Sequence, residues 1–365
     1  MNRLEELDPN FQAAPTAIVG GIAWFTVNHP PFVVDGLPWF KENGGEFYRL
    51  PKRAKGIVRK ALWDLGTMPT SGRVRFKTDS TAIHTRVQHS RPELGTPLMC
   101  SVATSGLDLY EGPPHRMTYW SSNHPTEPKA PYVTPFFFEP LTKKLREYTI
   151  YLPTYNDLVR FEIGLVPGAK LAAPSGYRRQ KPVVFYGTSV TQGGCCSRGA
   201  NGFVPLIGRR LGLNVINLGF SGNAFCDLAL VPLLDEIDMA CLVVDPVVNM
   251  GWERMQKDYI PFLQAIRARR PKLPLVLMTQ FRFAHESYMN PHRWDSASDS
   301  AVQTYRQMRR AGDRNVHLIE CRKFITPGPD HPSVDGIHLT DLGFEKMANG
   351  IAPILKKVLK LSCKT

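Results

Sequence analysis

The chain has 365 residues, of which 43% are hydrophobic and 21% are charged, and its formal net charge is +13. This length and composition are typical of a globular protein with two domains, each large enough to bury its own core. No apolar run approaches the length of a membrane-spanning helix, so we expect no membrane association. The basic residues are scattered and accompany no nucleic-acid-binding motif, so we expect no nucleic-acid partner.

The N-terminal residues are polar and lack the apolar segment of a signal peptide. The seven cysteines are an odd number and include the adjacent Cys195 and Cys196, which does not suggest a disulfide framework. Both observations favour a cytoplasmic protein, although a leader removed before this N-terminus would leave the same sequence.

Residues 1–175 contain several short runs in which hydrophobic and polar residues alternate. The clearest runs are Arg73–Thr78, Ile83–Val87, Tyr148–Leu152 and Leu158–Ile163. Alternation with a period of two is typical of strands that bury one face, and turn residues separate these runs. We therefore predict an antiparallel β-sandwich, of a jelly-roll-like kind, for this half of the chain.

Beyond a polar linker at residues 171–180, strand-like and helix-like segments alternate. We expect strands near residues 182–186, 214–217, 240–245, 274–279 and 315–319. We expect helices near residues 203–211, 227–235, 253–270, 296–311 and 341–358. Such alternation predicts an α/β domain with a parallel sheet and helices on both faces. The predicted domains are thus residues 1–175 and 176–365.

The loop after the first of these strands holds a candidate nucleophile. Val183–Tyr186 is a short apolar run that ends at Gly187 and is followed by Thr188 and Ser189. A hydroxyl at the C-terminal end of a strand lies where open α/β sheets bind their ligands. Ser189 is therefore the candidate nucleophile, although a serine in such a place can also serve only as a turn residue.

A candidate base lies near the C-terminus. Asp335 and His338 are three residues apart in a tight turn, so the carboxylate can bind one ring nitrogen while the other accepts the proton of Ser189. A serine hydroxyl needs such a base to become a good nucleophile. His331 is the competing candidate, but only His338 has a carboxylate three residues before it.

Two further segments supply candidate donors to an oxyanion. Val215–Asn223 is a predicted strand followed by a turn that contains Gly222, and Cys241–Met250 is a predicted strand followed by Asn249. The N–H of Gly222 and the side-chain amide of Asn249 could join the N–H of Ser189. Three such donors would form the cradle that acyl transfer needs for its developing negative charge.

Four sequence blocks resemble, in order and spacing, those of the SGNH hydrolases, also called GDSL-type esterases: Gly187-Thr-Ser189, Gly222, Asn249 and Asp335-x-x-His338. The resemblance implies a three-layer α/β/α fold with a flavodoxin-like parallel sheet in the C-terminal half. It also implies site residues. The implied triad is Ser189, Asp335 and His338, and the implied oxyanion hole is Ser189, Gly222 and Asn249.

This sequence departs from the family pattern at two positions. Thr188 replaces the usual aspartate of the first block, and Asn249 lies in Val-Val-Asn-Met rather than in Gly-x-Asn-Asp. A second resemblance concerns the N-terminal half. Ser105–Tyr110 is similar to the Gly-x-Asp-Leu-Tyr motif of a β-domain that precedes certain SGNH hydrolase domains. The two resemblances support each other, because the two domains occur together.

Two residues near these blocks are candidates for substrate contacts. Arg198 could reach an acidic or hydroxyl-rich substrate, or it could pair with a carboxylate in the fold. Asn223 could contact substrate, or it could cap the helix that follows.

The resemblance implies a serine esterase that hydrolyses small acyl esters, with O-acetyl groups on a small molecule or an oligosaccharide as the expected substrates. It implies no metal and no organic cofactor. One alternative is a lactonase or thioesterase with the same triad. The other is a catalytically inert carbohydrate-binding protein.

Overall fold

In the computed structural model, the chain folds into two compact units. The structure describes residues 14–91, 93–123, 132–137, 140–286 and 291–361. The first unit consists of Met1–Lys52, Thr67–Arg178 and Ser197–Ala200. The second unit consists of Arg53–Gly66, Arg179–Cys196 and Asn201–Thr365. Each unit therefore includes a short segment from the opposite side of residue 175, the boundary that we predict from the sequence.

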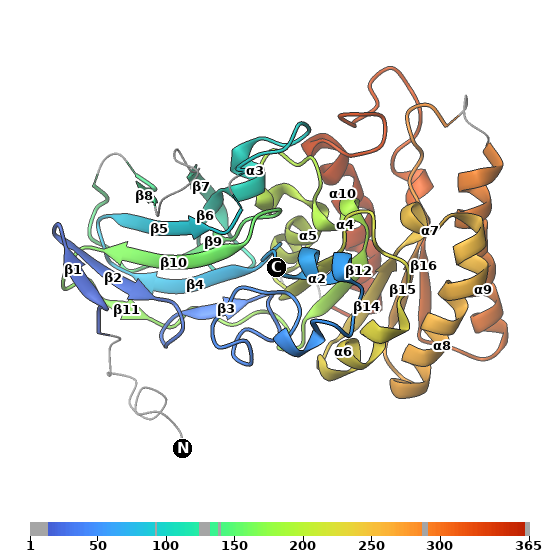
Figure 1. Ribbon diagram of the computed structural model, residues 1–365, viewed down its shortest axis with the longest axis horizontal. Helices are drawn as coiled ribbons and strands as arrows, with labels where there is room; N and C mark the ends of the chain where they lie inside the picture. Colours follow the sequence, from blue (N-terminus) through green and yellow to red (C-terminus); the bar gives the residue numbers. More distant parts are fainter. Residues whose placement is uncertain (1–13, 92, 124–131, 138–139, 287–290, 362–365) are drawn as a thin grey trace. The chain divides into compact units, whose positions relative to one another are not determined.

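The first unit contains two antiparallel sheets (Figure 1). One has the strand order β1-β2-β10-β5-β8, and the other has the order β11-β4-β9-β6-β7 with β3 paired to β4. The strands are β1 (Ala17–Val19), β2 (Ile22–Thr26), β3 (Val33–Asp35), β4 (Arg73–Thr78), β5 (Ile83–His89), β6 (Leu107–Glu111), β7 (Thr118–Asn123), β8 (Tyr132–Pro135), β9 (Arg146–Tyr151), β10 (Leu158–Leu165) and β11 (Leu171–Ala172). The short helix α3 (Ser101–Ser105) precedes β6.

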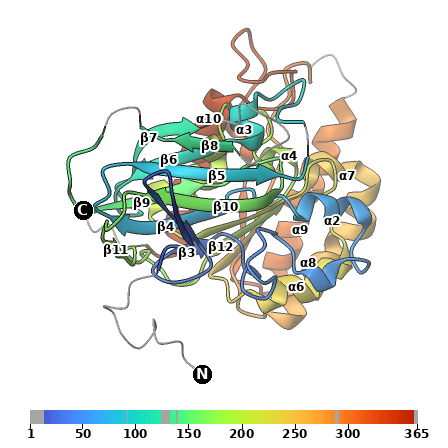
Figure 2. The ribbon, with the colours of Figure 1, turned by 60° about the vertical axis from the view of Figure 1, so that its left-hand side comes forward.

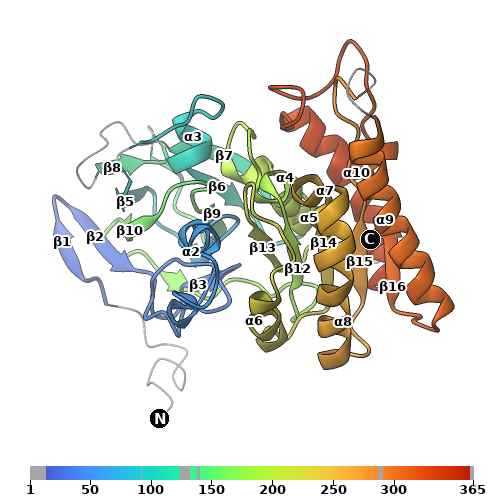
Figure 3. The same ribbon diagram turned by 45° about the vertical axis from the view of Figure 1, so that its right-hand side comes forward.

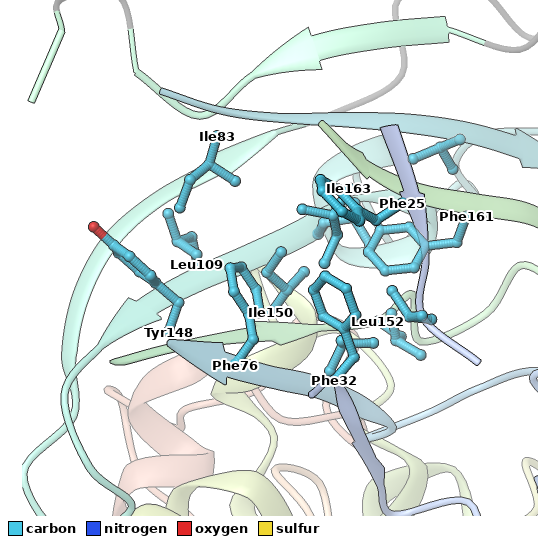
Figure 4. Packing of buried hydrophobic residues seen from close by; sticks show 14 of the residues in the cluster. Phe25, Phe32, Phe76, Ile83, Leu109, Tyr148, Ile150, Leu152, Phe161 and Ile163 are labelled. Carbon is cyan, nitrogen blue, oxygen red and sulfur yellow. The ribbon is translucent and has the colours of Figure 1, made fainter. Parts of the chain in front are cut away.

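The two sheets share one hydrophobic core, because their strands turn alternate residues toward it. In β4, Phe76 lies in this core, whereas the neighbouring Arg75 pairs with Glu147 outside it. Figure 4 shows Phe76 and Ile150 of one sheet packed near Phe161 of the other. The predicted β-sandwich is therefore confirmed.

The second unit is built on a five-stranded sheet with the order β13-β12-β14-β15-β16, in which every pairing is parallel. Its strands are β12 (Val183–Gly187), β13 (Val215–Gly219), β14 (Cys241–Asp245), β15 (Leu275–Met278) and β16 (Val316–Ile319). Its helices are α2 (Lys60–Gly66), α4 (Ser189–Gln192), α5 (Phe203–Leu211), α6 (Val231–Glu236), α7 (Val247–Arg254), α8 (Ile260–Arg269), α9 (Pro291–Arg310) and α10 (Asp341–Val358). Short turns of 3₁₀ helix are η1 (Lys52–Ala54), η2 (Gly199–Asn201), η3 (Leu228–Leu230) and η5 (Cys321–Lys323), and the π turn η4 (Met255–Tyr259) joins α7 to α8.

Helices cover both faces of this sheet (Figure 3). Helices α5 and α10 pack on each other, and α6 packs on α8 while α7 packs on α9. The strands β12, β14 and β15 are mainly apolar and are buried along their whole length, as expected for a sheet covered on both sides. The predicted α/β/α layers are confirmed. Within the described ranges, no helix combines the length and apolar character needed to cross a membrane.

Candidate active site

Ser189 lies at the carboxyl end of β12, where it is the first residue of α4 and only 5% exposed. Thr188 caps this short helix, since its side chain accepts a hydrogen bond from the N–H of Val190. Gly187 permits the close packing of the turn, because a Cβ atom there would lie 2.1 Å from Thr191 Oγ1. The local sequence thus places the hydroxyl of Ser189 at the edge of the sheet where the strands end.

The turn between β16 and α10 brings His338 to this hydroxyl. Ser189 Oγ and His338 Nε2 are 3.0 Å apart, and His338 Nδ1 lies 2.8 Å from Asp335 Oδ2. The other carboxylate oxygen of Asp335 accepts the backbone N–H groups of Ile337 at 3.0 Å and His338 at 2.7 Å. Gly336, with a φ of 88°, supplies the left-handed residue that this tight turn requires. The structure therefore joins the three predicted triad residues in one chain of hydrogen bonds.

The Asp335 carboxylate is held in its charged form. Burial alone would raise its pKa, but the hydrogen bonds from the His338 ring and from two backbone N–H groups outweigh burial and lower the pKa below its usual value. A charged carboxylate beside Nδ1 favours the tautomer that carries its proton there. Nε2 is then left as an acceptor facing Ser189, which is the arrangement of a general base.

His331, the competing histidine, is engaged elsewhere. Its Nδ1 lies 2.8 Å from Ser333 Oγ, and its Nε2 lies 2.9 Å from the carbonyl oxygen of Arg282. Both ring nitrogens therefore serve to hold the segment that leads into the Asp335 turn.

The other two predicted oxyanion donors, Gly222 and Asn249, also follow the carboxyl ends of strands. Gly222 follows β13 in a turn with a φ of 66°, and no acceptor binds its N–H among the residues that the structure describes. Asn249 lies in α7 after β14, and its Oδ1 accepts the N–H of Ala224 at 3.1 Å. This bond fixes the orientation of the amide, so its two Nδ2 protons point away from Ala224 and can be donated. Ser189 is the first residue of α4, so its N–H has no acceptor within the helix and can also be donated.

Two side chains that were not predicted as site residues, Gln192 and Tyr186, hold the loop that carries Gly222. Gln192 Oε1 accepts the N–H of Ser221 at 3.0 Å, and Tyr186 Oη accepts the N–H of Cys226 at 2.7 Å. Gln192 lies three residues after Ser189 and so on the same side of the helical turn, which is a signal that the sequence did contain. Tyr186 looks like an ordinary core residue of a strand, and nothing in its sequence context reveals its bond to a distant loop.

Asn223, one of the two candidate substrate residues, uses its amide inside this loop. Its Nδ2 donates to the carbonyl oxygen of Ser221 at 2.9 Å, and its Oδ1 accepts from Arg59 Nη1 at 2.9 Å. Asn223 does not cap a helix, since η3 begins only at Leu228.

Arg198, the other candidate, belongs to the segment Ser197–Ala200 of the first unit. Its guanidinium lies 3.8 Å from the centre of the Tyr119 ring, donates to Tyr110 Oη at 2.5 Å and lies 3.9 Å from Asp108 Oδ2. The same Asp108 oxygen accepts the N–H of Ala200 at 2.7 Å. Of the two roles considered for Arg198, the structure therefore favours pairing with a carboxylate of the fold, which is that of Asp108.

These contacts give a structural reading of the Gly-x-Asp-Leu-Tyr motif. Within β6, Leu109 is in the sandwich core, while Asp108 and Tyr110 project from the opposite side and bind Ser197–Ala200. Gly106 must lack a side chain, because a Cβ atom there would lie 2.4 Å from the carbonyl oxygen of Val102. The motif thus builds a cradle for the segment that follows the candidate nucleophile in the sequence.

The cysteines near Ser189 do not have the properties of nucleophiles. Burial, with a further contribution from the charge of Asp335, raises the pKa of the Cys195 thiol to about 11. Cys196 is buried. In the part of the chain that the structure describes, no group of three or more His, Cys, Asp or Glu residues is placed to hold a metal ion.

Comparison with protein-family models gives two matches. Residues 180–356 match the GDSL-like lipase/acylhydrolase family, and residues 22–171 match the Gly-x-Asp-Leu-Tyr domain that forms the N-terminus of SGNH-hydrolase-type esterases. Residues 180–356 are therefore a GDSL/SGNH-type hydrolase domain. The two matches confirm both resemblances seen in the sequence, and they support an ester hydrolase.

Solved structures share the fold of this GDSL-type protein. A protein described as a GDSL-like lipase from Bacteroides ovatus is 22% identical, with 94% of this chain and 100% of that chain covered at a TM-score of 0.85. A salicylyl-acyltransferase from a tetracycline biosynthetic pathway is 17% identical, with 94% and 99% covered at a TM-score of 0.75. A family two carbohydrate esterase from Cellvibrio japonicus is 11% identical, with 93% and 98% covered at a TM-score of 0.60. A search of curated protein sequences finds no match.

Proposed function

We propose that this GDSL-type protein is a serine esterase that removes small acyl groups, foremost O-acetyl groups, from a hydroxylated small molecule or an oligosaccharide. The observation that carries the proposal is the chain from Ser189 Oγ through the His338 ring to Asp335, with separations of 3.0 and 2.8 Å. A serine with a base at hydrogen-bond distance and a carboxylate behind that base is the arrangement that activates a hydroxyl.

In the first half of the reaction, Ser189 Oγ attacks the ester carbonyl while His338 Nε2 takes the hydroxyl proton. The Asp335 carboxylate stabilises the resulting imidazolium, and its lowered pKa keeps it charged for this task. The negative charge on the carbonyl oxygen is met by the N–H groups of Ser189 and Gly222 and by Asn249 Nδ2. His338 then protonates the departing alcohol oxygen, which leaves the acyl group on Ser189.

In the second half, water takes the place of the alcohol. His338 removes a proton from this water as it attacks the acyl carbonyl, and the same three donors stabilise the second tetrahedral intermediate. Collapse of that intermediate releases the acid and returns the proton to Ser189 Oγ. The proposal needs only the residues named, and each acts twice in the cycle.

The choice of an acetyl ester on a carbohydrate is supported by the fold that this chain shares with structures described as a family two carbohydrate esterase and an acetyl xylan esterase. A lactone or a thioester would use the same residues. A second candidate is transfer of the acyl group to an alcohol instead of water, and the fold that this chain shares with a salicylyl-acyltransferase over nearly the whole of both chains favours including it in the test.

The test is a matched panel of substrates with the wild-type protein and Ser189→Ala. Acetate release is measured from acetylated xylo- and cello-oligosaccharides and from aryl acetates. Hydrolysis of aryl esters of longer acids, lactones and acyl thioesters is measured beside it. We expect the highest kcat/KM for acetyl esters and no turnover with Ser189→Ala. A higher kcat/KM for lactones or thioesters would overturn the acetylesterase assignment. A product carrying the acyl group on an added sugar or alcohol, formed faster than free acid, would favour the transferase.

A further inference from the structure

Arg59 comes from a part of the sequence that matches the N-terminal domain, yet it packs within the hydrolase unit. It lies directly before α2, in the segment Arg53–Gly66, which Figure 2 shows in blue among the yellow elements of this unit. The segment is held by its own apolar residues, since Ala54, Val58 and Leu62 are all buried. The backbone that presents Arg59 is therefore anchored independently of its side chain.

The guanidinium of Arg59 makes four hydrogen bonds to the loop that follows Gly222. Nη1 donates to Asn223 Oδ1 and Nη2 donates to the carbonyl oxygen of Asn223, both at 2.9 Å. Nε donates to Asp227 Oδ1 at 2.5 Å and Nη2 to Asp227 Oδ2 at 3.0 Å, which is a bidentate ion pair. The guanidinium also lies 4.6 Å from the centre of the Phe225 ring. One side chain thus contacts three residues of a five-residue stretch.

This stretch sets the position of the Gly222 N–H. Asn223 N–H donates to the carbonyl oxygen of Phe220 at 2.9 Å and so closes the turn that contains Gly222. No side chain at Gly222 can hold the turn, because glycine has none and even a Cβ atom there would touch nothing within 4 Å. The turn is therefore fixed from its two ends, by Gln192 on Ser221 and by Arg59 on Asn223.

We propose that Arg59 is a positioning residue for the oxyanion hole. It holds Asn223 so that the Gly222 N–H points at the reacting oxygen before substrate arrives, which is the condition under which such a donor is effective. The proposal rests on the proposed esterase function. It also gives the N-terminal part of the sequence a role in the chemistry of the C-terminal part. Lysine cannot replace arginine here, because a single ammonium cannot bind two atoms of Asn223 and both oxygens of Asp227 together.

The chain offers a matched control in the same segment. Arg53 also forms a bidentate ion pair inside this unit, with Glu236 of α6. The side chains of Arg53 and Glu236 are 46% and 40% exposed, compared with 38% for Arg59. Glu236 lies outside the loop of residues 220–227, so Arg53→Gln removes a comparable ion pair without touching that loop. Arg59→Gln and Arg59→Lys are compared with it in full-length protein.

We expect Arg59→Gln to lower kcat by about tenfold to a hundredfold with little change in KM, less than the loss of roughly 10²–10³ caused by removing a donor outright. Arg59→Lys should recover only a small part of the kcat that Arg59→Gln loses. Added ethylguanidinium should raise the kcat of a third variant, Arg59→Ala. Arg53→Gln should keep the wild-type kcat at a similar thermal midpoint. Equal kcat for Arg59→Gln and Arg53→Gln, or a change in KM alone, would overturn the proposal.

A phosphonylating probe separates this inference from the proposed function. A fluorophosphonate places its phosphoryl oxygen in the oxyanion hole, so its rate of attachment to Ser189 reports both the nucleophile and the donors. Failure to label Ser189 in the wild-type protein would reject the esterase function itself. Normal labelling of the wild-type protein together with an unchanged rate in Arg59→Gln would reject the positioning role alone.

Discussion

Thr191, two residues after the candidate nucleophile, donates a hydrogen bond of 2.7 Å from its Oγ1 to Asp245 Oδ2, and Asp245 is buried. Burial raises the pKa of Asp245 to about 7, and the bond from Thr191 only partly opposes the shift. The nearby Tyr259 and Cys321 stay neutral, since burial raises their pKa values as well. The sheet therefore contains an acid that the folded state keeps protonated at pH values where an unfolded chain would not.

This raised pKa makes stability depend on pH in a defined direction. In the unfolded chain Asp245 loses its proton near pH 4, whereas in the folded protein it does so only near pH 7. The folded state binds the extra proton in between, so the free energy of unfolding falls as pH rises through this window, by a total on the order of 4 kcal/mol. Asp245→Asn keeps an acceptor for Thr191 and removes the titration. We expect it to be more stable than the wild type above pH 7 and similar to it at pH 4.

Denaturant unfolding of both proteins at intervals from pH 4 to pH 9 measures this difference. Two curves of free energy against pH that run parallel would contradict the prediction.

Ser189→Ala should retain the fold and lose turnover by several orders of magnitude. Ser189 is 5% exposed and its hydroxyl, within the described residues, bonds to the His338 ring alone, so alanine removes the attacking atom with little effect on packing. Loss of a triad nucleophile leaves a residual acceleration of roughly 10³–10⁴ over water. Steady-state hydrolysis of an aryl acetate, with circular dichroism to check folding, measures the outcome. A folded variant with near wild-type turnover would remove Ser189 from the mechanism.

The two histidines near the C-terminus should respond differently to alanine. His338→Ala should abolish turnover while leaving the thermal midpoint nearly unchanged, because the Asp335 carboxylate keeps its hydrogen bonds from the backbone N–H groups of residues 337 and 338. His331→Ala should lower the thermal midpoint, because it frees Ser333 and the carbonyl of Arg282, and the folded fraction should keep most of its kcat. Measuring kcat and thermal midpoint for both variants decides between them. The reverse pattern would make His331 the base.

Asn249 can be tested by separating its two hydrogen-bonding groups. Asn249→Asp retains the Oδ1 acceptor for Ala224 but loses the Nδ2 donor, whereas Asn249→Ala loses both. Loss of one oxyanion donor costs about 10²–10³ in kcat, or roughly 2.7–4 kcal/mol, and leaves KM nearly constant. We expect both variants to show this loss, with the larger loss in Asn249→Asp because its charge repels the oxyanion. The thermal midpoint should fall more in Asn249→Ala. A near-normal kcat in Asn249→Asp would leave only the two backbone donors.

Much of the hydrolase unit could be predicted from the sequence, because its strands and helices have clear apolar patterns. The helices at 203–211 and 341–358 have the bounds that the sequence predicts. The helix expected at 253–270 begins earlier, at Val247, and is interrupted at Gly251, whose φ of 63° and ψ of −179° are not helical. An isolated glycine inside a helical pattern is usually tolerated, so periodicity alone could not reveal this break.

The contacts that hold the candidate site in place could not be predicted in the same way. Asp335 and His338 are close in the sequence and reveal their relationship through spacing. Arg59 and Asp227 are 168 residues apart, and an arginine before a short helix looks like any solvated charge. Such pairs depend on how distant segments pack, and neither hydrophobic period nor turn chemistry carries that information.

The exchange of segments between the two units has a consequence for how this protein can be divided. A gene cut at residue 175 would express a hydrolase without Arg53–Gly66 and a β-sandwich without Ser197–Ala200. The first fragment would lose Arg59 from the loop around Gly222, and the second would leave the cradle formed by Asp108 and Tyr110 empty. Insertion, shuffling or loss of either half would therefore damage the other. The two halves are expected to be inherited, expressed and lost together, as a single evolutionary unit.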